Sequence, residues 1–438
     1  MGGGASLFLL GAGPNYMPFH VQFYTTFAAA LTHLFVVRVL HTSDWHLGQK
    51  FMTQTREPEQ QMALDWLFQQ VLEHQPDVLI VAGDIYDVSN PPTGAEEMYY
   101  RFLTRIAGTS CQHIVIIGGN HDSPYRLNAP RGLLRALRIY VVGAATDNPE
   151  DEIIRISGPD GQISAVIAAV PFLRERDFNN ITVSGENADD RIRRIQQGII
   201  QHYEQVAAAI GPFEGPVIAT GHLFAKGASS HEEQQNIYLG NLDNIAADEF
   251  PQRFNYIALG HIHRMQKVGK TEHIRYCGSL IPLSFSEKKD KKGIIIADFD
   301  ATGLVNTREI EAPVFRKLVT IKGTLQELEQ QLTQLHDPLL PLPSWVEIIL
   351  TGAPGIALPD RHLREYAEGL HLEILKIKME YTTASLSEQA PKEDLMSLSP
   401  DEVFLKKCAS AGLTTEKTTA LQREFEGLKE WMNEQNFE

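Results

Sequence analysis

The sequence predicts an α/β fold whose core is a mostly parallel β-sheet. From Arg38 to about Asp300, short apolar runs of strand length alternate with segments of helical period, and several runs end in glycine followed by polar residues. This alternation is typical of βαβ units, whose functional groups gather at the strand ends. The chain has 438 residues, of which 43% are hydrophobic and 21% charged, so it is long enough for two or three globular domains.

The charge and cysteine content exclude several classes of protein. There are 39 Lys and Arg residues against 55 Asp and Glu residues, which gives a net charge of −16 and no general attraction for phosphates. Binding to nucleic acid would therefore need a local basic patch or a partner. The three cysteines, Cys111, Cys277 and Cys408, form no CxxC pair, which excludes a disulfide framework and a thiolate zinc site. A reducing, cytoplasmic location is the simplest expectation.

Residues 1–37 form a leader without Asp, Glu, Lys or Arg, and residues 23–37 are largely apolar. A signal peptide needs a basic first region, and a membrane span needs about 20 clean apolar residues, whereas three threonines and a histidine interrupt this run. Its end, Val36–Leu40, has the composition of a strand that continues into the first motif. We therefore expect a disordered leader or a start codon assigned too early, and no membrane anchor.

The first region contains six runs with the composition of strands, at residues 36–44, 77–87, 113–122, 163–172, 216–222 and 256–263. Between the first two, Met62, Trp66 and Val71 recur near helical spacing, which completes a βαβ unit. Two further strands are predicted at residues 273–280 and 291–300, and the basic turn SEKKDKKG between them predicts a hairpin. These elements are assigned to a first domain, residues 38–312.

A second region begins at Pro313. Its segments are predicted to form strand, helix, strand, helix and strand, at residues 319–323, 325–335, 345–352, 360–370 and 372–381. We expect a small α+β domain over residues 313–382, a polar linker over residues 383–398 and a helical segment over residues 399–438.

Two helices are predicted in this last segment. Ser399-Pro400-Asp401-Glu402 has the form of a capping box with proline at the first helical position, and Gly412 ends the helix. A second helix from Thr415 carries an apolar stripe formed by Leu421, Phe425, Leu428 and Trp431. The stripe either folds back on the first domain or binds a partner, and its aromatic residues and the polar linker favour the partner.

Side chains suited to metal binding follow five of the predicted strands. Asp44 and His46 are two residues apart, so in extended backbone they point the same way, and His261 and His263 repeat this spacing. The other candidates directly follow a glycine, which allows a sharp turn: Asp84, Asn120 with His121, and His222.

Each of these motifs is weak evidence by itself, because an aspartate at a strand end usually caps a turn and a single histidine is usually a satisfied polar group. Five such motifs in order, each after a predicted strand, instead favour a metal centre. Carboxylate, amide and imidazole ligands without thiolates suit Mn²⁺, Fe²⁺ or Zn²⁺ better than Ca²⁺.

The motifs D-x-H, GD-x-x-D, GNHD, GH and GH-x-H, in this order, resemble those of the calcineurin-like metallophosphoesterases. Within that superfamily, RVLHTSDWHLGQ, VAGDIYD, YIALGHIHR and RYCGSLIPLSF are similar to the SbcD family of nuclease subunits, and the resemblance extends from Arg38 to the C-terminus. It implies a four-layer α/β metallophosphoesterase sandwich, a small α+β domain that caps it and binds DNA, and C-terminal helices.

The resemblance also implies two divalent metal ions, for which Mn²⁺ is expected first and Mg²⁺, Fe²⁺ or Zn²⁺ are alternatives. One ion would be held by Asp44, His46, Asp84 and His263. The other would be held by Asp84, Asn120, His222 and His261, with Asp84 as the bridge.

The same resemblance assigns two further residues to catalysis. His121 would stabilise the transition state or protonate the leaving 3′ oxygen, and Asp87 would orient His121. Nuclease relatives can carry a histidine at the position of Asp87, so a second catalytic histidine there is not expected in this chain.

The function implied is that of a metal-dependent DNA nuclease, with exonuclease activity on duplexes and endonuclease activity on single strands and hairpins. It would act in an ATP-dependent complex for DNA repair and recombination. Its partners would be DNA, a second copy in a homodimer, and an SbcC-type, SMC-like ATPase that binds the ATP and docks on residues 399–438.

A cluster of lysines either contacts phosphates of the substrate or lies on a solvent-exposed turn without such a role. It consists of Lys288, Lys289, Lys291 and Lys292. Two alternative functions remain: a stand-alone phosphoesterase acting on cyclic nucleotides or phosphoproteins, and a non-catalytic scaffold for the ATPase. The additional domain and helices argue against the first, and the complete set of motif residues argues against the second.

Overall fold

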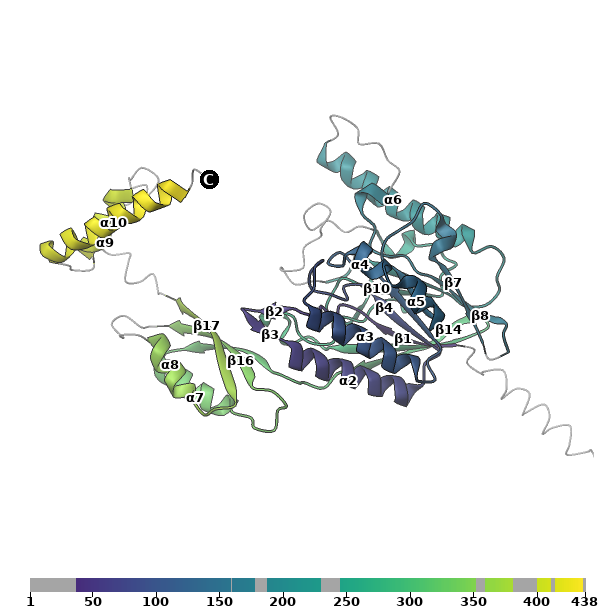
Figure 1. The fold of residues 1–438 in the computed structure, drawn as a ribbon, viewed down its shortest axis with the longest axis horizontal. Helices are drawn as coiled ribbons and strands as arrows, with labels where there is room; N and C mark the ends of the chain where they lie inside the picture. The colour runs from purple at the N-terminus through teal and green to yellow at the C-terminus, as the bar shows by residue number, and fades with distance from the viewer. Residues whose placement is uncertain are drawn as a thin grey trace, which may run out of the picture. The chain divides into compact units, whose positions relative to one another are not determined.

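The computed structural model describes most of the chain (Figure 1). The described residues are 37–158, 160–177, 187–229, 245–351, 359–380, 400–410 and 414–435. The expected leader therefore lies outside them except for Val37, and so does the expected linker 383–398. Val37 is buried and is the first residue of a strand, so it belongs to the sheet and not to a leader.

The first sheet has six strands in the order β14-β13-β1-β4-β5-β6. Their bounds are Gly303–Glu311, Gly293–Asp300, Val37–Thr42, Val78–Ala82, His113–Ile117 and Ile139–Val142. Strands β1, β4, β5 and β6 are parallel, and β13 is antiparallel to β1 and β14. Every residue of β4 and β5 is buried, which explains their unbroken apolar sequences.

The second sheet also has six strands, in the order β11-β12-β10-β9-β8-β7. Their bounds are Gln266–Lys267, Ile274–Tyr276, Tyr256–Gly260, Val217–His222, Ile163–Ala168 and Ile153–Ser157. Strands β8, β9, β10 and β12 run parallel, and the two edge strands are antiparallel to their neighbours.

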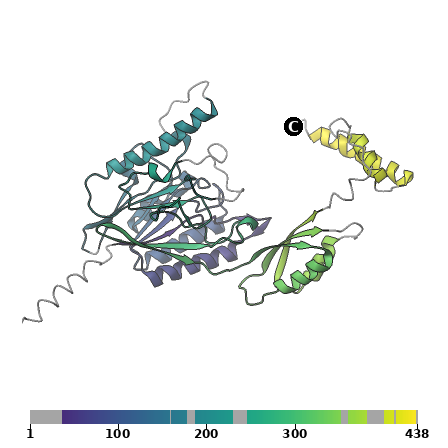
Figure 2. The same cartoon turned by 180° about the vertical axis from the view of Figure 1, so that it is seen from behind.

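The two sheets pack face to face and carry helices on their outer faces. Ile80 and Val115 of the first sheet share one apolar core with Ile167 and Ile218 of the second. Helices α2 (Glu57–His74) and α3 (Thr93–Ala107) cover the first sheet, and α6 (Ala188–Ala209) covers the second. Figures 1 and 2 show α2 and α3 on one side of the sheets and α6 on the other. This arrangement confirms the predicted four-layer sandwich.

The predicted hairpin around the lysine-rich turn is wrong. Strand β12 lies in the second sheet and β13 in the first, where β13 pairs with β1 and makes a hairpin with β14. The chain between β12 and β13 buries Leu280, Ile281 and Leu283 in the core beneath α2, so this segment crosses from one sheet to the other. A basic turn marks a loop but carries no information on which strands pair across it.

The second region contains the predicted order of elements. These are β15 (Leu318–Gly323), α7 (Leu325–Leu335), β16 (Ser344–Thr351), α8 (Pro359–Ala367) and β17 (Leu372–Glu380). The strands form a separate sheet in the order β15-β16-β17, and the helices bury Leu328, Leu332 and Leu363. The domain boundaries at residues 312/313 and 382/383 stay predictions.

Two helices follow at the positions predicted from the sequence, α9 (Pro400–Ser410) and α10 (Thr415–Gln435), and they belong to a second compact unit. Phe425 of α10 stacks on Phe404 of α9 with a ring separation of 4.5 Å, so it holds the helix pair together. Leu421 remains 44% exposed. The side chains of Leu428 and Trp431 lie outside the described residues.

Shorter elements complete the fold. The β2–β3 hairpin (Lys50–Phe51 and Gln54–Thr55) follows β1, and helices α4 (Pro124–Asn128) and α5 (Arg131–Ala136) follow β5. Among the described residues, no helix combines the length and the apolar character that a membrane crossing requires.

Candidate metal centre

The candidate ligands lie at the carboxyl ends of five parallel strands. Strands β1, β4 and β5 of the first sheet lead to Asp44 and His46, to Asp84 and Asp87, and to Asn120 and His121. Strand β9 of the second sheet ends in His222, and β10 leads to His261 and His263. Both sheets therefore contribute ligands to one site.

The backbone at this edge adopts conformations that side chains rarely take. Asp44, His46, Asp84 and His261 have φ values of 52°, 46°, 49° and 93°. Such residues cost free energy and persist where the surrounding structure holds them, which is typical of functional sites. Gly119 is required for a different reason: a Cβ atom there would lie 2.2 Å from Oδ1 of Asp84.

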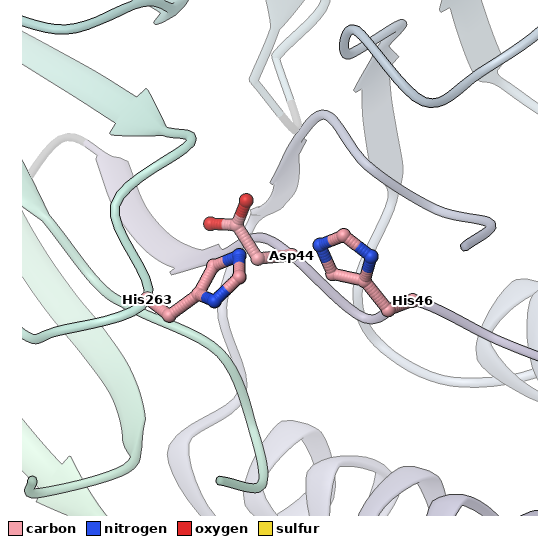
Figure 3. Close-up of side chains that lie close together, drawn as sticks. All are labelled: Asp44, His46 and His263. Atoms are coloured by element: carbon pink, nitrogen blue, oxygen red, sulfur yellow. The ribbon is translucent and has the colours of Figure 1, made fainter. Parts of the chain in front are cut away.

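Asp44, His46 and His263 form the first group of converging side chains (Figure 3). Each offers one ligand atom, and these atoms lie within 4.8 Å of one another. Burial alone lowers the pKa of His46, but the hydrogen bond to Asp87 and the charges of Asp84 and Asp44 outweigh it and raise this pKa to about 9. The negative field that holds a proton here also attracts a divalent cation.

Asp84 lies between the two expected ligand sets. Its Oδ2 is 3.5 Å from Nε2 of His46 and 3.2 Å from Nε2 of His222. Its Oδ1 accepts a hydrogen bond of 2.9 Å from the main-chain N–H of His121. Burial raises the pKa of Asp84, but the charge and hydrogen bond of His222 outweigh it and hold this pKa well below its usual range.

Asn120, His222 and His261 meet on the other side of the site. Oδ1 of Asn120 lies 3.0 Å from Nε2 of His222 and 3.2 Å from Nδ1 of His261. Burial and the charge of His222 lower the pKa of His261 to about 3, so this imidazole is neutral. A neutral imidazole is the form that binds a metal.

The donor set fits two divalent ions. Nε2 of His46 is buried, and within the described residues it has no hydrogen-bond partner. Its other nitrogen lies 3.1 Å from Oδ1 of Asp87. Oδ2 of Asp84 lies 3.5 Å from Nε2 of His46 without a hydrogen bond, and a metal ion bound by both atoms would satisfy the buried nitrogen. Mixed carboxylate, amide and imidazole donors match Mn²⁺, Fe²⁺ or Zn²⁺.

Asp87 contacts two histidines of the site through different atoms. Its carboxylate contacts His46, so a role in orienting His121 stays a prediction and would depend on its main chain. His121 is instead held by the main chain, since its Nδ1 lies 2.6 Å from the carbonyl oxygen of Asp87. The His121 ring is exposed and lies 4.8 Å from the His46 ring. One of its ring nitrogens also lies within ligand distance of the group formed with His46 and Asp84.

Sequence reasoning missed three supporting residues. Asp122 is buried and accepts hydrogen bonds from the main-chain N–H groups of Ile85, Tyr86 and Gly119, so it ties the second and third motifs together. Asp122 is the last residue of the GNHD motif, so this motif could have indicated it from the sequence. Gln60 of α2 donates to the carbonyl oxygen of His46, and no local pattern marked it.

The third missed residue is Glu287, whose Oε1 lies 2.9 Å from Nδ1 of His263. It lies 24 residues after its partner along the chain, inside the segment that the lysines had marked as a turn. Of those lysines, Lys288, Lys289 and Lys291 are exposed, but Lys292 is buried and paired with Glu287. Lys292 therefore does not face solvent.

Comparisons with known proteins agree with this geometry. Residues 37–265 match the family model described as calcineurin-like phosphoesterase, and residues 314–411 match the type 5 capsule protein repressor C-terminal domain. The SbcD chain of the nuclease SbcCD from Escherichia coli K12 is 37% identical over 395 residues, which cover 89% of this chain and 97% of that relative.

Two more distant relatives carry the same name. The protein from Rhodobacter capsulatus is 30% identical over 84% of this chain and 93% of its own length. The one from Bacillus subtilis is 29% identical over 74% of this chain and 82% of its own length. Together with the ligand geometry, these matches show that the chain belongs to the calcineurin-like phosphoesterase family and, within it, to the SbcD family of nuclease subunits.

Proposed function

We propose that this chain is the metal-dependent nuclease subunit of an SbcCD-type complex and hydrolyses DNA phosphodiester bonds. The observation that carries the proposal is the convergence of all seven expected ligand residues at five strand ends, with His121 beside them. A non-catalytic scaffold would not need this complete set. The relatives described above are named as nuclease subunits, and this name supports a nucleic acid as the substrate.

The two ions would share Asp84, with Asp44, His46 and His263 completing one ligand set and Asn120, His222 and His261 the other. Two bound divalent ions supply a nucleophile at neutral pH and stabilise the charge that develops on the phosphate. We favour Mn²⁺ among the ions that these donors suit.

His121 would act on the leaving oxygen. The carbonyl oxygen of Asp87 can only accept a hydrogen bond, so Nδ1 of His121 carries a proton and Nε2 is the nitrogen free to face substrate. As an imidazolium, His121 would donate its Nε2 proton to the 3′ oxygen as the bond to phosphorus breaks. Its exposure gives the substrate access to this nitrogen.

We further propose that an SbcC-type ATPase binds the helical segment and supplies the ATP site. The name of the relatives describes one part of a two-part complex. The net charge of −16 supports the proposal that the partner contributes part of the DNA-binding surface. The three cysteines are free and buried, which supports a reducing cytoplasm as the place of action.

A homodimer is proposed from exposed apolar side chains in the segment that follows the GNHD motif. Tyr125 of α4 is 85% exposed, and Leu133 and Leu137 at α5 are 74% and 51% exposed. Several large exposed apolar side chains within one short segment are typical of an interaction surface. A symmetric dimer would bury them against the same residues of the second copy.

A nuclease assay tests the central proposal. A labelled hairpin duplex is incubated with Mn²⁺, with and without the ATPase and ATP. We expect cleavage that requires the metal and increases with ATPase and ATP. Hydrolysis of cyclic nucleotides or phosphoproteins with no cleavage of DNA would favour the stand-alone phosphoesterase, and no hydrolysis of any of them would favour the scaffold.

A further inference from the structure

A buried ion pair contacts His263. The side chains of Glu287 and Lys292 are almost fully buried, and Nζ of Lys292 lies 2.5 Å from Oε2 of Glu287. The other carboxylate oxygen, Oε1, lies 2.9 Å from Nδ1 of His263. One carboxylate thus joins an interior lysine to a candidate metal ligand.

Lys292 also holds the main chain of the same histidine. Its Nζ donates to the carbonyl oxygen of His263 at 2.7 Å and to Oγ of Ser279 at 3.0 Å. Oε2 of Glu287 accepts a further hydrogen bond of 3.0 Å from the main-chain N–H of Leu283. The pair therefore contacts both the backbone and the ring of His263.

The contact with Glu287 determines which ring nitrogen of His263 is free. An ionised carboxylate only accepts hydrogen bonds, so Nδ1 carries a proton, and in the neutral imidazole Nε2 is the nitrogen with the lone pair. In Figure 3 the ring of His263 lies beside Asp44, with His46 on the other side of that carboxylate. We propose that Glu287, itself held by Lys292, is a positioning residue that fixes the tautomer and orientation of His263 for metal binding.

This inference rests on the proposed metal-dependent function. A purely structural role is the competing explanation, but buried ion pairs contribute little net stability, because desolvation of the two charges offsets their attraction. A carboxylate that orients a metal-binding histidine has a direct effect on metal affinity, and loss of such a partner typically weakens binding 10- to 100-fold.

Two double variants separate positioning from stability. Glu287→Gln with Lys292→Met, and Glu287→Leu with Lys292→Met, both remove the buried charges, and they differ in whether an acceptor remains for Nδ1 of His263. Calorimetric titration with Mn²⁺ measures the affinity of each ion. We expect the leucine variant to bind one of two ions about 10- to 100-fold more weakly, and the glutamine variant to recover most of this loss.

Nuclear magnetic resonance of metal-free protein labelled with ¹⁵N-histidine provides the second readout. His263 is expected to carry its proton on Nδ1 in the wild type and in the glutamine variant, and to show a tautomer mixture in the leucine variant. Equal Mn²⁺ affinities in the two double variants, or a wild-type His263 protonated at Nε2, would overturn the inference.

Two control variants match the changed residues. Lys291→Met alters the neighbouring lysine, which is exposed and paired with Glu311. Glu152→Gln alters another buried glutamate that pairs with a histidine, since its Oε2 lies 2.9 Å from Nε2 of His202. Both should bind Mn²⁺ as the wild type does, and weaker binding by Glu152→Gln would show that the measurement reports general damage and overturn the assignment. Neither readout needs DNA, so loss of nuclease activity alone would count against the proposed function only.

Discussion

His121 is the candidate site residue whose ring is exposed to solvent, while its Nδ1 is held by the main chain of Asp87. We expect His121→Ala to keep both metal ions and to lose turnover by about 10²- to 10⁴-fold, because a proton donor at the leaving oxygen typically contributes that much. Metal analysis combined with single-turnover cleavage of a duplex measures the two effects separately.

Loss of a metal ion in the His121→Ala variant would contradict this role. A nitrogen of His121 lies close enough to join the group formed with His46 and Asp84. If His121→Ala loses one ion, His121 is a ligand and not a proton donor. Asn90→Ala serves as the control, because Asn90 is exposed and its Oδ1 accepts a hydrogen bond from Arg126.

Asp84 is the proposed bridge, because its carboxylate lies close to His46 of one proposed ligand set and His222 of the other. Asp84→Asn is expected to abolish cleavage and to lower metal content below two ions per chain, because two like-charged ions lose the anion between them. Elemental analysis after gel filtration checks the metal content. Asp65→Asn, which changes a half-exposed aspartate paired with Arg105, is the control. Full cleavage by metal-depleted Asp84→Asn would rule out the two-metal mechanism.

At the scale of elements, strand β1 carries a buried histidine whose titration affects stability. Burial lowers the pKa of His41 to about 3 from its ordinary value of 6.5. Between these values the unfolded chain binds a proton that the folded chain does not, so the free energy of unfolding falls as the pH drops below 6.5.

His41→Gln removes this titration. Between pH 6.5 and pH 5, the wild type should lose about 2 kcal/mol more stability than the variant, at about 1.4 kcal/mol per pH unit. Urea unfolding of both proteins at the two pH values gives the difference. Parallel losses in the two proteins would show that His41 is protonated in the folded chain.

Leu133 of α5 is one of the exposed apolar residues proposed for dimerisation. Leu133→Asp should convert the dimer to a monomer without unfolding it, because the side chain is 74% exposed and buries little within one chain. Light scattering after gel filtration gives the mass. Leu339→Asp, at a position that is 91% exposed in the small domain, should leave the mass unchanged. An unchanged mass for Leu133→Asp would exclude this surface.

The ligand-bearing strands could be predicted because their signals are local. Each buried strand is an apolar run, and each candidate ligand follows within a few residues, so Asp44 and His263 could be named as candidates from five such motifs in order. The pairing of β13 with β1, and the contact of Glu287 with His263, depend on residues far apart in the chain. Local patterns do not encode such contacts. Spacing also does not reveal that the carboxylate of Asp87 contacts His46 while its carbonyl oxygen contacts His121.

At the scale of the whole molecule, the helical segment is the expected docking site of the ATPase. Phe425 is engaged by Phe404, so the partner would contact the exposed side of the helix pair, where Leu421 lies. Leu421→Arg should abolish co-purification with the ATPase, while metal content and cleavage of frayed DNA stay as in the wild type. Arg423→Glu, an exposed change of charge two residues away and therefore on a different face of α10, is the control. Undiminished co-purification of Leu421→Arg would contradict the assignment.

The proposed ligands come from the rims of both sheets, and this has a mechanical consequence. Asp44, Asp84 and Asn120 follow strands of the first sheet, whereas His222 and His263 belong to the second. An apolar core lies between the sheets. It resists separation of the two sheets, but it opposes their sliding past each other only through side-chain packing. Each bound ion would therefore link the first sheet to the second. Metal binding would make it harder for the two sheets to slide past each other. A small displacement of one sheet along the other would disrupt both metal sites at the same time.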